Sequence, residues 1–368
     1  MTAAVAARVD APVESVRARA FTVPTDRPES DGTMAWDSTT LVLVEVEAGG
    51  DTGFGWTYCA PAAAKVVDEL LQLVVCGRSA FDVAGIQLAA RAALRNAGYP
   101  GIGSCAVSAL DVALWDLKAK LAGLPLVGLL GSIHDAVPVY GSGGFCSYSD
   151  DELAEQLAGW VEAGIPRVKM KVGREPERDS VRVRTARDAI GDEAELYIDA
   201  NGALSVKQAS YFASEWSAFD VRWFEEPVSS LDLAGLRLLR ELFPPGIEVA
   251  AGEYGYTPAD FRELVECVDC LQADATRCGG ITGLLQAGIL AAAFELDLSG
   301  HTAPSIHAHA MCAVPRARHI EWFHDHVRIE RLFFDGFVEP DGGAVRPDRS
   351  RPGLGVEPKW ADLERFAA

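Results

Sequence analysis

The sequence predicts an α/β fold, a (β/α)8-type barrel preceded by a smaller α+β domain. Three observations lead to this prediction. The 368 residues are 49% hydrophobic, which is enough for a large core divided between two unequal domains. Strand-like segments precede helical ones in the first third of the chain. After Gly131, short apolar runs alternate with amphipathic stretches, as in βαβ units.

The N-terminal part begins with a predicted hairpin. Residues 40–47 are rich in β-branched side chains and are followed by Gly49, which predicts a strand and a turn. Residues 62–97 are rich in Ala and Leu at helical spacing, and a further helix is expected over 104–123, where a glycine ends it. Strands followed by helices are typical of an α+β domain.

Eight short apolar runs then have the length and composition of buried strands. They cover residues 137–140, 167–172, 195–199, 223–226, 248–252, 270–274, 297–299 and 319–321. So even a repeat favours a closed barrel over an open doubly wound sheet. The stretch from Phe334 onward is rich in Gly, Pro and Arg, and we expect it to return to the first domain.

The charge and cysteine content limit the partners and the compartment. There are 33 Lys and Arg against 53 Asp and Glu, a net charge of −20 that would repel phosphate backbones and anionic membranes. No apolar run approaches the roughly 18 residues of a membrane span, and none is placed as in a signal peptide. We therefore expect a cytoplasmic protein with no nucleic-acid or membrane partner. Its eight unevenly spaced cysteines should be thiols, Cys267 and Cys270 included.

Nearly every predicted barrel strand ends in an ionisable side chain. The carboxyl ends of barrel strands meet at the active site, so these side chains should converge. Lys169 and Lys171 lie on one face of the second strand, where mutual repulsion would lower a pKa and produce a general base. Two solvated lysines on an edge strand are the alternative.

Three carboxylates end the next three strands, Asp199, Glu225 and Glu253. They cannot all stay ionised in a desolvated site without a counter-charge, and hard oxygen ligands on adjacent strands suit Mg²⁺. Any one of them could be a helix cap or a solvated loop residue. Three on successive strands favour a metal site.

The last strands supply a second candidate base. Asp274 ends the sixth strand and His301 follows the seventh. A carboxylate beside an imidazole fixes its tautomer and raises its basicity, so His301 could act across the barrel from Lys171. A satisfied core histidine is the alternative. Glu321, on the eighth strand, adds a polar group at the same rim.

As an ordered set, these motifs resemble the enolase superfamily, and most closely its mandelate racemase subgroup. The matching segments are Lys169-Met170-Lys171, Asp199-Ala200-Asn201, Glu225-Glu226-Pro227, Gly252-Glu253, Asp274 to Gly280, the His301 segment and Glu321. Each is weak alone, but the set is highly specific and spans essentially the whole chain. The resemblance implies a capping α+β domain at residues 1–133, a barrel at 134–333 and a returning segment at 334–368.

The resemblance also implies a metal-assisted proton abstraction. Asp199, Glu225 and Glu253 would bind Mg²⁺, which holds the carboxylate of a small-molecule substrate. The shared chemistry is removal of the proton alpha to that carboxylate, giving an enediolate that the metal stabilises. A homo-oligomer is also implied.

The remaining site residues take roles from the same resemblance. Lys171 would be the base on one face of the α-carbon, and His301, paired with Asp274, would serve the other. Three further residues would contact the substrate: Lys169, Glu321 and Asn201.

Two features narrow the reaction. The lysines are Lys65, Lys118, Lys120, Lys169, Lys171, Lys207 and Lys359, so none ends the fourth to eighth strands, unlike muconate lactonising enzymes, dipeptide epimerases or enolase. The segment expected to cap the site, residues 25–32, is strongly polar, which favours a polyhydroxylated substrate. The prediction is an acid-sugar dehydratase that converts an aldonate or aldarate to a 2-keto-3-deoxy acid.

Three alternatives stay open from the sequence. A racemase or epimerase of a 2-hydroxy acid would use both bases without consuming its substrate. An aldolase could form a Schiff base at Lys171, but the three carboxylates would then have no role. A non-catalytic binding protein could share the fold.

Overall fold

The computed structural model describes residues 10–368, and its N-terminal part is built on a three-stranded antiparallel sheet. The sheet has the order β1 (Ser15–Ser30), β2 (Ala35–Ala48) and β3 (Asp51–Tyr58). The predicted hairpin is β2–β3, and Gly49 and Gly50 make its turn with φ of 60° and 83°. The sequence analysis missed β1, whose polar second half hides its alternating pattern.

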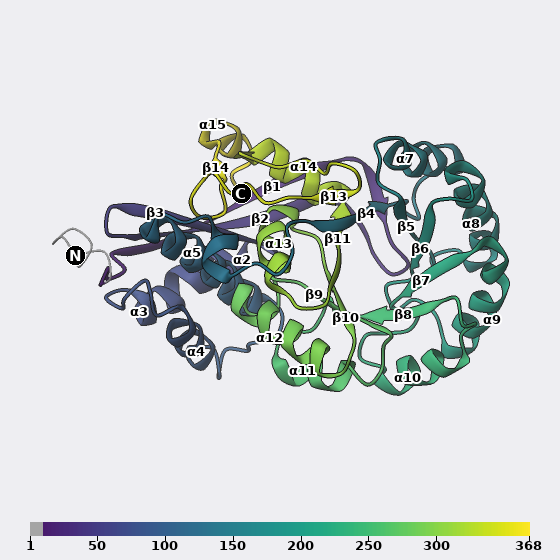
Figure 1. The fold of residues 1–368 in the computed structure, drawn as a ribbon, viewed down its shortest axis with the longest axis horizontal. Helices are drawn as coiled ribbons and strands as arrows, with labels where there is room; N and C mark the ends of the chain where they lie inside the picture. The colour runs from purple at the N-terminus through teal and green to yellow at the C-terminus, as the bar shows by residue number, and fades with distance from the viewer. Residues whose placement is uncertain (1–9) are drawn as a thin grey trace.

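Helices pack on one face of this sheet (Figure 1). They are α2 (Ala62–Val66), the π-helical η1 (Val67–Leu71), α3 (Gln72–Val75), α4 (Val83–Ala93) and α5 (Ile102–Ala122). Helix α5 ends at Gly123, which is left-handed with φ of 68°, as the sequence predicts. It approaches β3 so closely that a side chain at Gly53 or Gly55 would collide with its backbone.

Eight parallel strands form a closed barrel. They are β4 (Val137–Gly143), β5 (Arg167–Lys171), β6 (Glu195–Asp199), β7 (Val221–Glu225), β8 (Glu248–Ala251), β9 (Cys270–Ala273), β10 (Asp297–Gly300) and β11 (Ala317–Phe323). Pairing of β11 with β4 closes the ring, which confirms the predicted barrel with its N-terminal α+β domain.

Helices surround the barrel in sequence order (Figure 1). The main ones are α7 (Asp150–Glu162), α8 (Pro176–Ile190), α9 (Val206–Trp216), α10 (Leu233–Leu242), α11 (Pro258–Leu264), α12 (Gly280–Ala293), α13 (Pro304–Ala310) and α14 (His324–Phe333). Short turns add α6 (Leu126–Leu130), η2 (Ser217–Phe219) and η3 (Met311–Ala313).

Aromatic side chains fill the barrel interior below its carboxyl-terminal mouth. Tyr140, Tyr197 and Trp223 are fully buried together, and the Tyr197 and Trp223 rings stack 5.5 Å apart. The buried His319 ring lies edge-on to Tyr140 at 4.7 Å. Because this layer fills the centre, it leaves room for a site only at the mouth.

The end of the C-terminal segment lies against the N-terminal sheet (Figure 1). It contains β12 (Phe334–Asp335), β13 (Ala344–Val345), β14 (Glu357–Pro358), α15 (Trp360–Leu363) and η4 (Glu364–Phe366). The Ala368 amide donates to the Ala20 carbonyl at 3.0 Å. The division at residues 1–133, 134–333 and 334–368 stays a prediction.

The turn of the β1–β2 hairpin lies on the barrel mouth and forms a lid, here defined as residues 31–40 (Figure 1). A side chain at Gly32 would meet the Ala200 carbonyl at 2.5 Å and the Val172 carbonyl at 2.7 Å, so the lid touches the ends of β5 and β6. The Arg174 guanidinium donates to the Met34 carbonyl at 3.1 Å and fastens the lid tip.

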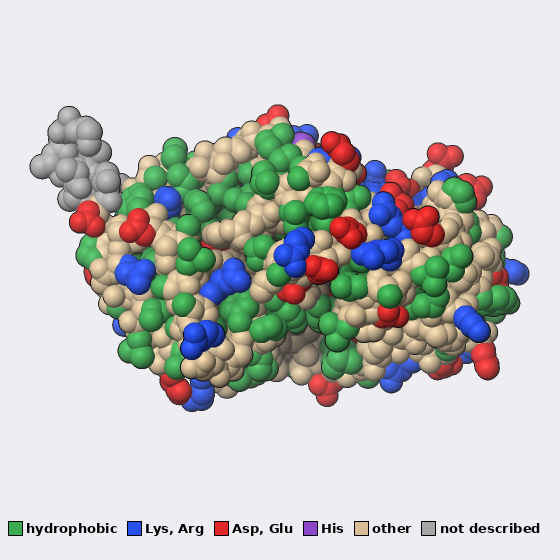
Figure 2. Space-filling model, turned by 90° about the horizontal axis from the view of Figure 1, so that it is seen from below, with side chains coloured by type: hydrophobic (Ala, Val, Ile, Leu, Met, Phe, Trp, Pro, Cys, Tyr) green, Lys and Arg blue, Asp and Glu red, His purple; other side chains and the backbone are tan. Residues whose placement is uncertain are grey.

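The surface carries charged side chains of both signs, and the cysteines are thiols. On the face in Figure 2, acidic and basic side chains are interspersed over the barrel part. Across residues 10–368, no helix is long and apolar enough to cross a membrane. All eight cysteines are free thiols.

Candidate active site

The strand ends bring the nine predicted site residues into one connected cluster. The Lys169 ammonium lies at its centre, 2.6 Å from a Glu225 oxygen, 2.8 Å from Glu321 and 3.2 Å from Asp199. The Lys171 ammonium bonds to Asp199 at 2.6 Å. These side chains are almost fully buried, so their charges interact in a medium of low polarity.

The three carboxylates of Asp199, Glu225 and Glu253 converge on one point. Each offers an oxygen within 4.8 Å of the others, and all three are buried. The first two end β6 and β7, whereas Glu253 reaches the cluster through Gly252, where φ is 140° and a side chain would collide with the Gln272 carbonyl. Three hard oxygen donors in this arrangement fit a divalent cation such as Mg²⁺.

Charge crowding is visible in the pKa of one carboxylate. Burial and the neighbouring Asp199 raise the pKa of Glu225 to about 8, even though Lys169 opposes the shift. The cluster therefore holds more negative charge than its lysines neutralise, which is the condition the sequence analysis expected for a cation site.

The lysine pair behaves differently from the expectation that repulsion would lower a pKa. Burial, the largest single effect, disfavours the charged form of Lys171, but Asp199, Glu321 and Glu225 together outweigh burial and Lys169 and raise the pKa above its usual range. The pKa of Lys169 is raised in the same way, chiefly by Glu225 and Glu321, although burial opposes the shift. The prediction was wrong because it weighed the lysines against each other and not against the carboxylates between them.

On the far side of the cluster, His301 is held by carboxylates at both ring nitrogens. Nδ1 lies 2.8 Å from Asp274, and Nε2 lies 3.1 Å from Glu253 and 3.5 Å from Glu321. Burial disfavours the imidazolium, but these carboxylates raise the pKa of His301 to about 10. The ring is therefore a protonated donor at neutral pH.

Asn201 and Glu226 owe their positions to unusual backbone torsions. Their φ values are 46° and 37°, uncommon for side-chain-bearing residues. The backbone N–H of Asn201 donates to the Asp199 carboxylate at 2.8 Å, and the side-chain Oδ1 of Asn201 is buried and unpartnered. Glu226 has no role predicted from the sequence beyond its place in the Glu225-Glu226-Pro227 motif. The turn after β7 buries it beside Glu253, which raises its pKa further after burial.

Arg277 was also given no role from the sequence. Its guanidinium lies 3.2 Å from Glu253, a candidate metal ligand, and 3.4 Å from Asp274, which bonds to His301. Arg277 therefore links these two carboxylates. The sequence feature that could have indicated a site residue is the position of Arg277 three residues after Asp274. Its contacts to strands β8 and β9 could not be read from spacing alone.

A cavity of about 360 Å³ opens above the cluster. Lys171, Asn201, Glu253, His301 and Glu321 are part of its floor. Its roof, defined here as the lining residues of the lid and of the end of β3, consists of Asp31, Trp36, Ser38, Thr39, Thr40, Tyr58, Cys59 and Ala60. Of the segment 25–32 that was expected to cap the site, only Asp31 lines this cavity, because residues 25–28 bulge out of the β1–β2 register.

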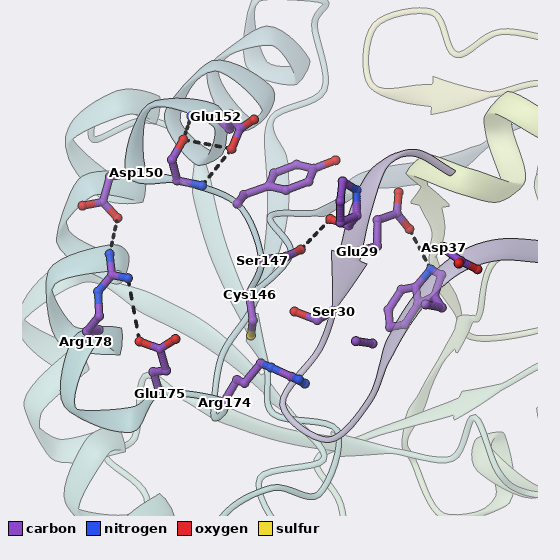
Figure 3. A pocket seen from close by; sticks show the side chains of 15 residues that line it. Glu29, Ser30, Asp37, Cys146, Ser147, Asp150, Glu152, Arg174, Glu175 and Arg178 are labelled. Atoms are coloured by element: carbon purple, nitrogen blue, oxygen red, sulfur yellow. Dashed lines mark hydrogen bonds and ion pairs between the residues drawn. The ribbon is translucent and has the colours of Figure 1, made fainter. Parts of the chain in front are cut away.

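A second, larger cavity of about 960 Å³ lies beside the first and shares Trp36 with it. Figure 3 shows Arg174 and Arg178 in it, with Arg178 paired to Asp150 and Glu175. Of the triad, Glu253 lines the smaller cavity and none lines the larger one, whose wall includes Glu29 of a second, partly exposed group with Asp26 and His324. We therefore place the active site in the smaller cavity.

The fold and the site define a barrel with a carboxylate triad at its mouth, flanked by Lys171 and the Asp274–His301 pair. Residues 15–131 match the N-terminal domain of the mandelate racemase/muconate lactonizing enzyme family, and residues 152–362 match the enolase C-terminal domain-like family. The chain belongs to the mandelate racemase/muconate lactonizing enzyme family of the enolase superfamily.

Several relatives are similar over nearly their full length. A 3,6-anhydro-α-L-galactonate cycloisomerase of Streptomyces coelicolor is 32% identical, over 96% of this chain and 99% of the relative. An L-talarate/galactarate dehydratase of Salmonella typhimurium is 31% identical, over 88% of this chain and 83% of the relative.

Solved structures agree with the fold. A mandelate racemase/muconate lactonizing enzyme-like protein from Rubrobacter xylanophilus is 53% identical with a TM-score of 0.96, covering 97% of this chain and 100% of that one. A racemase from Streptomyces coelicolor with bound magnesium is 31% identical with a TM-score of 0.91, covering 97% of this chain and 100% of that one.

Proposed function

We propose that the protein is a Mg²⁺-dependent enzyme that removes the proton alpha to a carboxylate and dehydrates an acid sugar to a 2-keto-3-deoxy acid. Asp199, Glu225 and Glu253 are the proposed metal ligands. Bound Mg²⁺ would polarise the substrate carboxylate and so acidify the neighbouring C–H bond. Magnesium in a related solved structure supports this assignment.

The observation that carries the proposal is the placement of Lys171 across the barrel mouth from the hydrogen-bonded pair Asp274–His301. Lys171 ends β5 and His301 follows β10, with β4 and β11 between them on one side of the ring. Once Asp199 is a metal ligand, its charge no longer holds Lys171 protonated, and the neutral amine can accept the α-proton.

His301 completes the dehydration. Asp274 orients the ring through Nδ1, so Nε2 can donate a proton to the leaving β-hydroxyl. The α-proton and the hydroxyl leave as the elements of water, and the resulting enol becomes the 2-keto acid. Lys169 and Glu321 would bind the substrate carboxylate beside Asn201.

The names of relatives support an acid sugar but do not select one. They include dehydratases named for arabinonate, for gluconate and for talarate and galactarate, and two cycloisomerases. A racemase of a 2-hydroxy acid is the second candidate, because Lys171 and His301 could each exchange a proton on one face of the substrate.

One experiment separates these functions. The protein with Mg²⁺ is incubated in D₂O with sugar acids and 2-hydroxy acids, and NMR follows the keto product and the α-proton signal. We expect a keto product that disappears with EDTA. Inversion or exchange without a keto product would favour the racemase, and no change across the library would contradict both.

A further inference from the structure

The roof of the active-site cavity carries negative charge and no cation. Among its described residues Asp31 has a carboxylate, and Ser38, Thr39 and Thr40 offer hydroxyl groups. Cys59 can add only further negative charge, since a hydrogen bond from Cys105 lowers its pKa to about 7. Neither Lys nor Arg comes from the lid or the end of β3 into this cavity.

Three cationic side chains line the cavity, and each is already held by carboxylates. His301 lies 2.8 Å from Asp274 and 3.1 Å from Glu253. Lys171 bonds to Asp199 at 2.6 Å. Arg277 is shared between Glu253 at 3.2 Å and Asp274 at 3.4 Å, whose combined charge exceeds its own. All three cations are therefore bound by carboxylates of the floor, and none comes from the roof.

The side wall adds no positive charge, and Arg328, behind the roof, is paired with the Asp325 carboxylate at 2.8 Å. His326 stacks on Tyr58 with ring centroids 3.3 Å apart, and burial lowers its pKa to about 3, so the ring is neutral. Behind the roof, Thr39 donates to the buried Asp325 at 2.7 Å, and Glu29 is buried nearby.

The nearest arginines on the lid side face elsewhere. Arg174 and Arg178 line the neighbouring cavity, not this one (Figure 3). Arg174 is bound to the Met34 carbonyl, and Arg178 pairs with Asp150 and Glu175. Neither can meet a group held under Asp31 without breaking these contacts.

We propose that the site selects sugar acids with one carboxylate and a neutral far end over the corresponding diacids. The inference rests on the proposed function, which places the reacting carboxylate on the floor. A second carboxylate at the far end would then lie under Asp31 without a cation. A terminal hydroxyl could instead donate to the oxygens of Ser38 and Thr39, whose own protons are given to Asp37 and Asp325. Repulsion between two like charges in such a site corresponds to about a tenfold preference.

The test compares two matched pairs of six-carbon acids, D-gluconate with D-glucarate and D-galactonate with galactarate. Each acid is assayed with Mg²⁺ for kcat/KM, and its binding is measured in parallel by calorimetry. We expect the monoacid of at least one pair to be favoured about tenfold or more. Equal or better use of the diacid in both pairs would overturn the inference.

Asp31→Asn tests the stated cause. Asparagine keeps the oxygen that accepts hydrogen bonds from Thr33 and Met34, so the lid turn is preserved. The monoacid-to-diacid ratio should fall severalfold in this variant. Asp37→Asn is the matched control, because Asp37 is an exposed lid carboxylate that lines the neighbouring cavity, and its ratio should not change. Equal ratios in Asp31→Asn and the wild type would overturn the role of Asp31.

The two measurements separate failure of the inference from failure of the proposed function. Preferred binding of a monoacid without any product would contradict dehydration and support the selectivity. Turnover of diacids alone would support dehydration and overturn the selectivity. If no acid binds or reacts, both fall.

Discussion

At the scale of single residues, the proposed function divides one reaction between Lys171 as the base and His301 as the acid. Lys171→Ala should lower both α-proton exchange and keto-acid formation by roughly 10²- to 10⁴-fold. His301→Asn should lower keto-acid formation similarly but keep exchange, because it removes only the acid. NMR in D₂O measures both rates.

A surface lysine provides the control for this pair. Lys207 is exposed on α9, so Lys207→Ala should leave both rates unchanged. Loss of exchange in His301→Asn as complete as in Lys171→Ala would show that His301 also takes part in proton abstraction, against the division proposed here.

Cys59 is a second residue whose surroundings predict its reactivity. Its thiol lines the cavity, and the hydrogen bond from Cys105 outweighs burial and lowers its pKa to about 7. Iodoacetamide at pH 8 should label Cys59 ahead of the buried Cys270 and Cys278, whose pKa values burial raises. Peptide mass spectrometry measures the order, and the exposed Cys76 shows that the reagent is active. Labelling of Cys59 no faster than of Cys278 would contradict the prediction.

At the scale of elements, the joint between α5 and α12 fastens the N-terminal part to the barrel. The Asp111 carboxylate accepts the Thr282 amide at 3.0 Å at the start of α12 and its hydroxyl at 2.6 Å. A side chain at Gly280 would collide with Asp111, so the two helices meet as closely as glycine allows. Burial raises the pKa of Asp111 to about 7 in spite of these bonds.

This joint should make stability depend on pH. Between the unfolded pKa near 4 and the folded pKa near 7, the unfolded chain loses the Asp111 proton first, so folding weakens as the pH rises. Asp111→Asn removes that loss, which is at most on the order of 4 kcal/mol. Urea unfolding should show the variant gaining more on the wild type at pH 8 than at pH 5, because only part of the loss has developed by pH 5. A constant difference would contradict the assignment.

Elements also show what the sequence could predict. All eight barrel strands followed from the length and composition of short apolar runs, because parallel strands buried on both faces are almost continuously hydrophobic. Strand β1 was missed, since Thr25–Pro28 bulges and its neighbours are polar. Glu226 was missed because a positive φ, which sequence spacing does not encode, turns it into the site. The lysine pKa direction depended on distances across three strands.

At the scale of the whole molecule, a divalent ion should stabilise the folded protein. Mg²⁺ at 100 times its Kd should add about 2.7 kcal/mol, because it binds the assembled carboxylates and not the unfolded chain. Differential scanning calorimetry with Mg²⁺ and with EDTA should show a higher Tm with the metal. Glu225→Gln should remove most of this difference, and an equal gain in that variant would contradict the metal site.

The predicted homo-oligomer is also a property of the whole molecule. Light scattering of the purified protein decides it, with a mass above the 39.3 kDa of one chain as the expected result. A mass of one chain at all concentrations would contradict it.

The lid comes from the start of the described chain, whereas His301 and Glu321 come from near its end. Contacts between such distant segments have a high entropic cost and form late in folding. During refolding, the barrel should recover its secondary structure before the molecule recovers turnover. The return of activity therefore reports when the N-terminal hairpin docks on the barrel. Turnover can thus be used to follow the last step of folding.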